Sequence, residues 1–317
     1  MNKKIAAIIL IIIIGMIYSC GSKPAAKPFN NYLFGEADNK DQLGSEPYIP
    51  TRAEIVIKAI LKAYPDKIEK AEFRNNDWAV LLKGTWYYYS DGKMLPENEF
   101  VNTAKYRTYQ FYDYPDELPQ WTPFSPEEIE EYKNLTNAGS QSTTRRSNFF
   151  LDALWQVSSN QIETEKLMDY ISFFGKYVKM HKSLIDKLEQ IEKQIAAMGR
   201  ADRQIQAWIN SIDIFEGYNW RNIAESQSRS YHSYGIAIDF LPSNLNGKQT
   251  YWLWTSQYRE DWWNVTYSER YHPPAAVIRL FESYGFIWGG KWDLFDTMHF
   301  EYRPEILIIN ELPPSNL

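Results

Sequence analysis

The chain has 317 residues, of which 44% are hydrophobic, 16% aromatic and 23% charged. A chain with 12 Trp, 23 Tyr and 16 Phe can bury a large core, which excludes wholesale disorder. The formal net charge of −6 argues against a protein that binds nucleic acid through a broad basic surface. The single cysteine excludes an intrachain disulfide and a thiolate metal cluster.

The chain begins with a segment typical of an export signal. Two lysines precede an almost purely apolar run from Ile5 to Ile17, which is shorter than a membrane-spanning helix of about 20 residues and suits the core of a signal peptide. The run continues into Tyr18-Ser19-Cys20 and resembles the lipobox of bacterial lipoproteins, although Tyr18 is bulkier than that pattern prefers. The resemblance implies cleavage before Cys20, its lipidation, and a membrane-anchored protein on the extracytoplasmic side of the cell envelope. The alternative is an uncleaved anchor helix beside a buried free cysteine.

Composition and periodicity divide the chain after residues 1–19, the predicted signal peptide, into three parts. Residues 20–50 are rich in Gly, Ser, Pro, Asn and Asp and are expected to form a flexible tether. Residues 51–147 are expected to form an α+β region of unknown role. Residues 148–317 are expected to hold a helical lead-in and the domain that carries the chemistry. The boundary between the last two parts is a polar stretch at residues 137–147.

Local signals predict helices and a hairpin in the first of these folded parts. Thr51 and Glu54 fit a capping box for a helix that Pro65 ends. Trp78–Leu82 and Thr85–Tyr89 are rich in β-formers and are predicted to pair as a hairpin.

Helical signals dominate from about Asn148 onward, and an earlier helix is predicted to begin at Ser125, which is followed by proline. Apolar residues recur at helical spacing from Leu184 to Met198, and Gly199 is expected to end that helix. The apolar stripe is expected to face the core, with a partner helix as the alternative. His181 lies in a lysine-rich stretch and is expected to be a solvated helix residue.

After Ile212 the pattern changes to short strands between aromatic loops. Gly235–Phe240 and Phe300–Tyr302 are predicted strands, and His272, which precedes two prolines, is expected in a loop. Six of the twelve Trp lie between residues 252 and 292, which fits either an aromatic-walled groove for peptides or sugars or a well-packed core. The predicted fold class is α+β, with a small, mostly antiparallel sheet flanked by helices, preceded by a helix-rich region with a β-hairpin.

Four residues of this last part form a candidate metal centre. His232 precedes a turn at Gly235, and Asp239 lies in the following strand, on the face opposite its large apolar residues. Two imidazoles, from His232 and His299, and the Asp239 carboxylate supply three ligands for Zn²⁺ and leave a fourth position for water, as in catalytic zinc sites. Asp296, three residues before His299, is placed to act as a general base. Spacing alone leaves open that these are hydrogen-bonded core residues.

Two motifs carry a family resemblance. Ser-x-His-x-x-Gly-x-Ala-x-Asp from Ser230 and Asp-x-x-His-Phe-Glu from Asp296 resemble the signature of the D-alanyl-D-alanine carboxypeptidase family of zinc peptidases. That family includes the vancomycin-resistance D,D-dipeptidases and the L-alanoyl-D-glutamate endopeptidases of phage lysins. The Gly-Phe-Ile-Trp-Gly-Gly-Lys-Trp lead-in from Gly285 is most similar to the endopeptidase-like branch. The resemblance runs from about Ile212 to Tyr302 and implies a hedgehog/D,D-peptidase type of fold there.

The resemblance also implies the central roles. It implies Zn²⁺ ligands at His232, Asp239 and His299. It implies that Asp296 activates the attacking water, with Asp293 as the second candidate for that base. The predicted function is a zinc-dependent peptidase that hydrolyses stem or cross-link peptides of peptidoglycan. The alternative is a non-catalytic envelope lipoprotein that binds peptide or glycan through a peptidase-like domain.

Three further residues receive roles with alternatives. Arg221 resembles the arginine that faces the substrate in this family, where a guanidinium can stabilise an oxyanion or hold a carboxylate. It is nearer to the first histidine of the motif than in many members, so a structural or exposed arginine is the alternative. Ser230 is expected to form a hydrogen bond within the site or to stabilise the local turn. Glu301 is expected to orient a metal ligand from behind.

Overall fold

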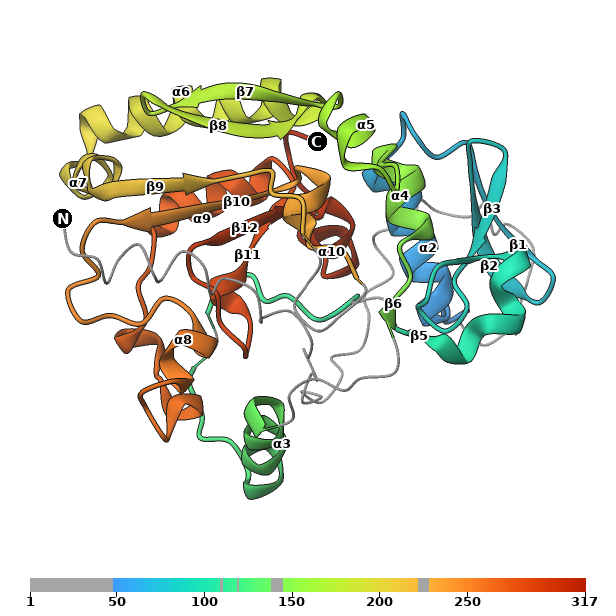
Figure 1. Cartoon of the computed structure of the whole chain (residues 1–317), viewed down its shortest axis with the longest axis horizontal. Helices are drawn as coiled ribbons and strands as arrows, with labels where there is room; N and C mark the ends of the chain where they lie inside the picture. The colour runs from blue at the N-terminus through green and yellow to red at the C-terminus, as the bar shows by residue number, and fades with distance from the viewer. Residues whose placement is uncertain (1–47, 109–110, 119, 138–144, 222–227) are drawn as a thin grey trace.

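The computed structural model describes residues 48–108, 111–118, 120–137, 145–221 and 228–317. The predicted signal peptide, the lipidation site Cys20 and nearly all of the tether lie outside these residues, as does most of the polar boundary stretch. Among the described helices, none combines the length and the apolar character that crossing a membrane requires. The mixture of helices and small antiparallel sheets confirms the predicted α+β class (Figure 1).

A four-stranded antiparallel sheet organises the C-terminal part, in the spatial order β11-β12-β10-β9. Both predicted strands are present in it as β10 and β12. Helix α9 covers one face, where the Phe281 ring lies 4.4 Å from that of Phe300 and 5.5 Å from that of Phe240. The elements are β9 (Ile212–Glu216), β10 (Ala237–Pro242), α9 (Ala275–Ser283), β11 (Phe286–Trp288) and β12 (His299–Tyr302).

Short helical elements connect these strands. The His272 prediction is confirmed, because this residue lies in the loop before α9, where its Nε2 is 2.7 Å from the Tyr267 carbonyl oxygen. Trp252, Trp262 and Trp288 are buried, so these members of the tryptophan cluster belong to packed interior. The connecting elements are η5 (Tyr231–Tyr234), α8 (Trp252–Ser256), η6 (Trp262–Asn264), η7 (Tyr267–Glu269) and η8 (Gly289–Lys291), and α10 (Pro304–Ile309) follows the last strand.

Residues 145–211 form helices and one β-hairpin beside the sheet (Figure 1). Helical structure dominates here, as predicted, and the hairpin is an element that the prediction did not contain. Next to the turn the strands bury Ile171, Phe173, Val178 and Met180 and leave Ser172 and Tyr177 exposed. The turn residues Phe174 and Gly175 both have positive φ, as a tight hairpin turn requires. The elements are α4 (Phe149–Trp155), α5 (Gln161–Glu165), β7 (Met168–Phe173), β8 (Lys176–His181), η4 (Lys182–Leu184), α6 (Ile185–Ala201) and α7 (Arg203–Ser211).

Two further predictions for this part are wrong. Gly199 lies inside α6 and does not end it; a Cβ there would lie 2.9 Å from Cδ1 of Ile209, so the glycine allows α7 to pack closely on α6. His181 is the buried last residue of β8 and not a solvated helix residue. It is covered by Trp155, whose ring centroid is 5.4 Å from that of the imidazole.

The N-terminal part combines helices with a second antiparallel sheet, in the spatial order β1-β2-β3-β4. The predicted hairpin forms its centre. One of the two hydrogen bonds of the predicted capping box of α2 is present, since Thr51 accepts a hydrogen bond from the Glu54 amide at 3.2 Å. The Glu54 carboxylate contacts Tyr48 and Lys58 instead of the Thr51 amide. The elements are α2 (Arg52–Ala63), β1 (Lys70–Arg74), β2 (Asp77–Leu82), β3 (Thr85–Tyr88), β4 (Leu95–Pro96), η3 (Glu97–Lys105), β5 (Tyr106–Arg107), α3 (Pro126–Asn137) and β6 (Arg145–Arg146).

The helix predicted after Ser125 is α3, and its capping box is complete. The Glu128 amide donates to the Ser125 hydroxyl at 3.2 Å, and the Ser125 amide donates to the Glu128 carboxylate at 2.7 Å. Both orphan donors at the start of this helix therefore have a local partner.

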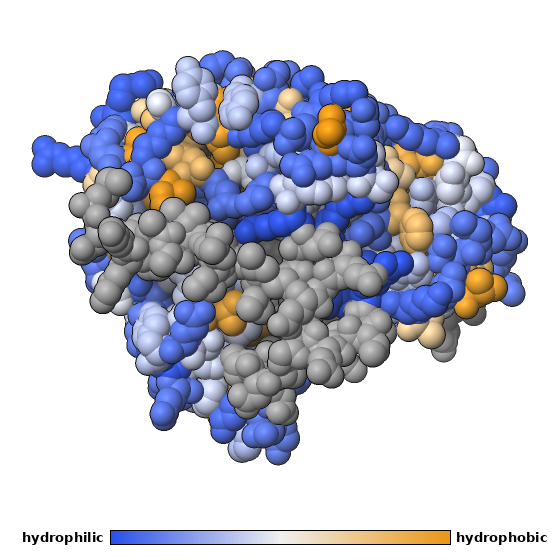
Figure 2. Space-filling view, in the orientation of Figure 1, coloured by the Kyte–Doolittle hydropathy of each residue, from blue (hydrophilic) through white to orange (hydrophobic). Residues whose placement is uncertain are grey.

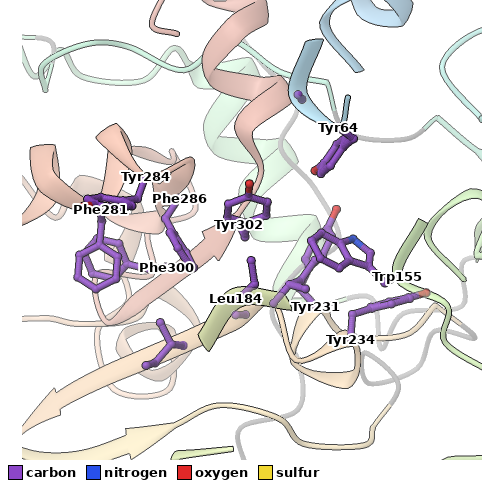
Figure 3. Packing of buried hydrophobic residues seen from close by; sticks show 14 of the residues in the cluster. Tyr64, Trp155, Leu184, Tyr231, Tyr234, Phe281, Tyr284, Phe286, Phe300 and Tyr302 are labelled. Carbon is purple, nitrogen blue, oxygen red and sulfur yellow. The ribbon is translucent and has the colours of Figure 1, made fainter. Parts of the chain in front are cut away.

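The N-terminal and C-terminal parts share one hydrophobic core. Helix α2 packs against α10, and the Trp155 ring contacts those of Tyr64 and Tyr302 edge-on, with centroids 6.0 and 5.8 Å apart (Figure 3). On the face seen in Figure 2, hydrophilic residues cover most of the described surface, and hydrophobic ones stand in small separate groups. The C-terminal part is therefore packed against the N-terminal part through buried aromatic contacts.

Candidate metal centre

His232, Asp239 and His299 converge at one buried point. Each offers one ligand atom, and these three atoms all lie within 4.8 Å of one another. The sheet explains the convergence, because Asp239 of β10 is directly opposite His299 of β12 in the antiparallel register. His232 comes from η5, immediately before β10. The three residues that the sequence predicts as ligands are therefore brought together.

The turn around His232 is held by local contacts. The Ser230 hydroxyl accepts a hydrogen bond from the His232 amide at 3.3 Å, which is the turn-stabilising alternative for this serine. Gly235 has a φ of +65°, and a Cβ there would lie 2.4 Å from the Met168 sulfur. Only glycine fits both this backbone conformation and the close approach of the β7–β8 hairpin.

The hydrogen bonds of His232 define its tautomer. Its Nδ1 lies 2.7 Å from the carbonyl oxygen of Gly217 and so donates a proton to it. In the neutral imidazole, Nε2 then carries a lone pair, and this atom faces Asp239 Oδ2 at 3.3 Å. Two electron-rich atoms at this distance need a proton or a cation between them.

His299 has a carboxylate on each side. Its Nδ1 lies 2.8 Å from Asp239 Oδ1, and its Nε2 lies 3.1 Å from Glu301 Oε2. Burial opposes the charged imidazolium, but the hydrogen bonds to Asp239 and Glu301 outweigh it and raise the pKa of His299 to about 10. Burial raises the pKa of Asp239, but the neighbouring His232 and His299 outweigh burial and lower it. The centre therefore favours positive charge next to Asp239.

Asp296 presents an unused acceptor beside this cluster. Its Oδ1 is buried and has no hydrogen-bond partner among the described residues. Burial, with a smaller contribution from the charge of Asp239, raises the pKa of Asp296 to about 8, although His299 acts in the opposite direction. The second candidate, Asp293, has a more exposed side chain; burial raises its pKa as well, with Arg270 acting to lower it, so the pKa direction does not separate the two, whereas only Asp296 has a buried oxygen without a partner among the described residues. The geometry thus favours Asp296 over Asp293 as the acid at the centre.

Arg221 lies near the centre without joining the cluster. It follows β9, and its Nη2 is 3.9 Å from Oε1 of Glu216. Its positive charge acts to lower the pKa values of Asp296 and Tyr251, so the guanidinium is within electrostatic reach of both. This position is compatible with the predicted contact with substrate.

The residues present fit a divalent zinc ion. Two imidazole nitrogens and one carboxylate are a ligand set that Zn²⁺ accepts at about 2.0–2.1 Å from each ligand, with a further position left open. The outer nitrogens of both histidines are held by a carbonyl and a carboxylate, as is usual for histidines that bind metals. One oxygen of Asp296 has no hydrogen-bond partner among the described residues, and the lone pair of His232 faces Asp239. Both features fit a bound cation or polar ligand.

Two residues beside the cluster, Gly217 and Tyr251, belong to no motif that marks them in the sequence. Gly217 contributes only its carbonyl, which has no side-chain signature, but a Cβ there would lie 2.3 Å from the Lys179 carbonyl oxygen. Tyr251 forms an isolated antiparallel bridge with Asp296 and is buried, so the two side chains lie next to each other. A bridge outside the named strands links distant segments and is hard to detect in a single sequence.

Comparison with known proteins finds a matching family for part of the chain. Residues 224–302 match the family described as D-alanyl-D-alanine carboxypeptidase, so the resemblance predicted from the two motifs is confirmed for this segment. A second match, over residues 56–111, is to a domain of unknown function (DUF8518).

A curated relative narrows the similarity. The chain is 32% identical over 82 residues to the peptidoglycan L-alanyl-D-glutamate endopeptidase CwlK of Bacillus subtilis (strain 168). The alignment covers 24% of this chain and 40% of that protein, so the chain spans well under two thirds of the relative's length. No solved structure matches the chain.

Proposed function

We propose that the protein is a zinc-dependent peptidase that hydrolyses peptides of peptidoglycan. The single observation that carries the proposal is the convergence of His232, Asp239 and His299 on one buried point, with an unpartnered oxygen of Asp296 beside it. In this proposal Nε2 of His232, a carboxylate oxygen of Asp239 and Nδ1 of His299 hold the zinc ion, and Glu301 orients His299 from behind.

The roles of the other residues follow from their positions. Zinc supplies a Lewis acid that lowers the pKa of water and polarises the scissile carbonyl. Asp296 takes the proton of the attacking water and later delivers it to the leaving amine, because a dication at the cluster favours its carboxylate form. Arg221 stabilises the developing oxyanion or holds a substrate carboxylate. Ser230 keeps the His232 turn in place and borders the substrate.

The substrate class is supported by the relatives. The family description names D-alanyl-D-alanine carboxypeptidase activity, and the curated relative is a peptidoglycan L-alanyl-D-glutamate endopeptidase. Both descriptions name a peptide bond that involves a D-amino acid. The lead-in from Gly285 to Trp292 favours the endopeptidase-like branch for this chain, and a D,D-carboxypeptidase is the second option.

Digestion of purified peptidoglycan tests the proposal directly. The chain with its metal restored is incubated with intact sacculi, and the released fragments are identified by mass spectrometry. We expect new termini at one bond, either L-Ala–D-Glu or D-Ala–D-Ala. We also expect both bound zinc and cleavage to be lost in His232→Ala and His299→Ala. If either variant keeps its zinc and its activity, the proposed mechanism is wrong.

The competing function is a non-catalytic lipoprotein that binds peptide or glycan through this domain. The complete ligand set and the adjacent acid argue against it, since a binding domain has no need of either. The digestion separates the two functions, because bound zinc and retained sacculi without new termini would favour the binder.

The lipobox-like segment supports a membrane anchor at Cys20. We propose that the mature chain begins at this residue, is held at the envelope by its lipid, and reaches peptidoglycan through the tether. Radiolabelled palmitate should be incorporated into the intact chain and not into Cys20→Ser. Equal labelling of the two chains would exclude this anchor.

A further inference from the structure

A row of buried charged residues extends from the metal centre along β12 and into the start of α10. His299, Glu301, Arg303 and Glu305 alternate along the chain and are only 1–3% exposed. Glu301 contacts His299 through one oxygen, at 3.1 Å, and Arg303 Nη1 through the other, at 3.4 Å. Buried charges are costly unless they are paired, so each member of this row depends on its neighbours.

Arg303 joins this row to both histidines. Its Nη1 donates to the hydroxyl of Tyr231 at 2.7 Å, and Tyr231 is the residue before His232 in η5. On its other side, Nε of Arg303 donates to Glu305. One guanidinium thus contacts the carboxylate behind His299 and the residue adjacent to His232. Its planar fork suits such simultaneous contacts.

The row ends in the N-terminal part of the molecule. The Tyr64 hydroxyl, at the end of α2, donates to Oε2 of Glu305 at 2.7 Å, and this hydrogen bond is buried. Burial, together with the charge of Glu305, raises the pKa of Tyr64 well above its ordinary value, which keeps the hydroxyl protonated as a donor. Tyr64 also packs on Trp155 and Tyr302 (Figure 3), which fixes its ring.

We infer that Arg303, Glu305 and Tyr64 are positioning residues for the metal centre, so that helix α2 of the N-terminal part completes the support of His299. The inference rests on the proposed zinc site and goes beyond it, because it gives residues 52–64 a role in metal affinity. Groups that orient metal-bound histidines typically change metal affinity by about 10- to 100-fold when altered. Tyr64 acts through two intervening residues, so its effect should be smaller.

The test measures zinc affinity in the full chain by competition with a chromogenic chelator. Tyr64→Phe removes one hydroxyl and keeps the ring, and it should raise the zinc dissociation constant about three- to tenfold. Arg303→Lys keeps the charge and loses the fork, and it should raise the constant about 10- to 100-fold. The matched control is Tyr106→Phe. It removes a tyrosine hydroxyl that donates to a carboxylate of the N-terminal part, Glu99, at 2.8 Å, outside the row.

Two further measurements separate positioning from general stability. The temperature of thermal unfolding without metal should be lowered more in Tyr64→Phe than in Tyr106→Phe, because the Tyr64 hydroxyl donates to a buried carboxylate, so zinc affinity is compared at a temperature at which all variants are folded without metal. The visible absorption of the cobalt(II)-loaded protein should change in Tyr64→Phe and Arg303→Lys and stay constant in Tyr106→Phe, because this absorption reports ligand geometry.

The outcomes are distinct. Zinc affinities of Tyr64→Phe and Arg303→Lys within twofold of the unsubstituted chain would overturn the inference, as would an equal loss in Tyr106→Phe. If the unsubstituted chain binds zinc and cleaves no peptide, the proposed function fails, while the affinity differences still decide the role of the row.

Discussion

Two buried histidines of this molecule differ in what surrounds them. His299 lies between two carboxylates, and the hydrogen bonds to them raise its pKa to about 10 in spite of burial. His181, at the end of β8, has neutral partners: its Nδ1 accepts a hydrogen bond from the Ser183 amide at 3.2 Å, and its Nε2 lies 3.2 Å from the Trp155 carbonyl oxygen. Burial, with the nearby charge of Lys67, lowers the pKa of His181 to about 4.

The contrast shows that burial alone does not make a histidine functional. All hydrogen-bonding capacity of the neutral His181 ring is used by groups of the chain itself, so no further ligand is needed there. Around His299, in contrast, the Asp239 carboxylate faces His232 Nε2 at 3.3 Å, and one buried oxygen of Asp296 has no hydrogen-bond partner among the described residues. A bound cation would satisfy these groups, which the chain itself leaves without a partner.

The largest expected effect comes from removing the Asp239 carboxylate, one of the two beside His299. Asp239→Asn keeps the size of the side chain and removes the negative charge and one metal ligand. We expect zinc affinity to fall by more than the roughly 100-fold typical of outer groups and peptide cleavage to become undetectable. Metal analysis after dialysis and digestion of peptidoglycan measure both effects.

Glu301→Gln is the control for this change, because it neutralises the other carboxylate beside His299 and leaves all three proposed metal ligands in place. It should weaken zinc binding by about 10- to 100-fold and leave measurable cleavage at saturating zinc. Equal effects of the two substitutions would mean that Asp239 is no more than an orienting group.

The ligand set could be predicted from the sequence because two of its three residues lie close together in the chain. His232 and Asp239 lie on either side of one turn and strand, and alternation along β10 assigns Asp239 to its face. The partner strand adds His299, which the register places opposite Asp239. The family resemblance was needed to choose these residues over a hydrogen-bonded core.

The parts that sequence reasoning missed depend on contacts between distant segments. His181 is buried because Trp155 covers it. The residues before it can be recognised as a strand only if the turn at Phe174 and Gly175 is identified first. The Tyr64–Glu305 hydrogen bond joins residues 241 positions apart. No local pattern reports such a contact.

A second prediction separates chemistry from metal binding at the centre. Asp296→Asn removes the proposed base and should leave zinc affinity within a few fold. The rate of peptide cleavage should fall by about 10²- to 10⁴-fold, the range expected for loss of a general acid–base catalyst. Steady-state kinetics on a synthetic stem peptide, with zinc content measured in parallel, tests this.

His181→Gln is the matched substitution at the other histidine and should leave the cleavage rate of the folded protein within a few fold. If His181→Gln lowered the rate as much as Asp296→Asn does, the distinction between the functional and the structural histidine environment would be wrong.

The smallest expected effect is on the pH dependence of stability. Between about pH 6.5 and pH 4, His181 takes up a proton in the unfolded chain and not in the folded one, so the folded state loses stability as the pH falls through this window. The full difference corresponds to about 3 kcal/mol. Denaturant unfolding of His181→Gln at several pH values should show a shallower loss of stability than the unsubstituted chain.

Asp152 provides a control with the opposite sign. Burial raises its pKa to about 6, although Arg229 and Tyr234 act to lower it. The folded state therefore holds a proton on Asp152 that the unfolded chain releases, and this group stabilises the fold as the pH falls from about 6 to about 4. Asp152→Asn should make the acid loss of stability steeper, and His181→Gln should make it shallower. If stability fell with pH equally steeply in the two variants, His181 would not be held neutral by burial. A His181 that takes up its proton at the same pH in the folded and the unfolded chain makes no contribution to the pH dependence of stability, so its substitution would change nothing.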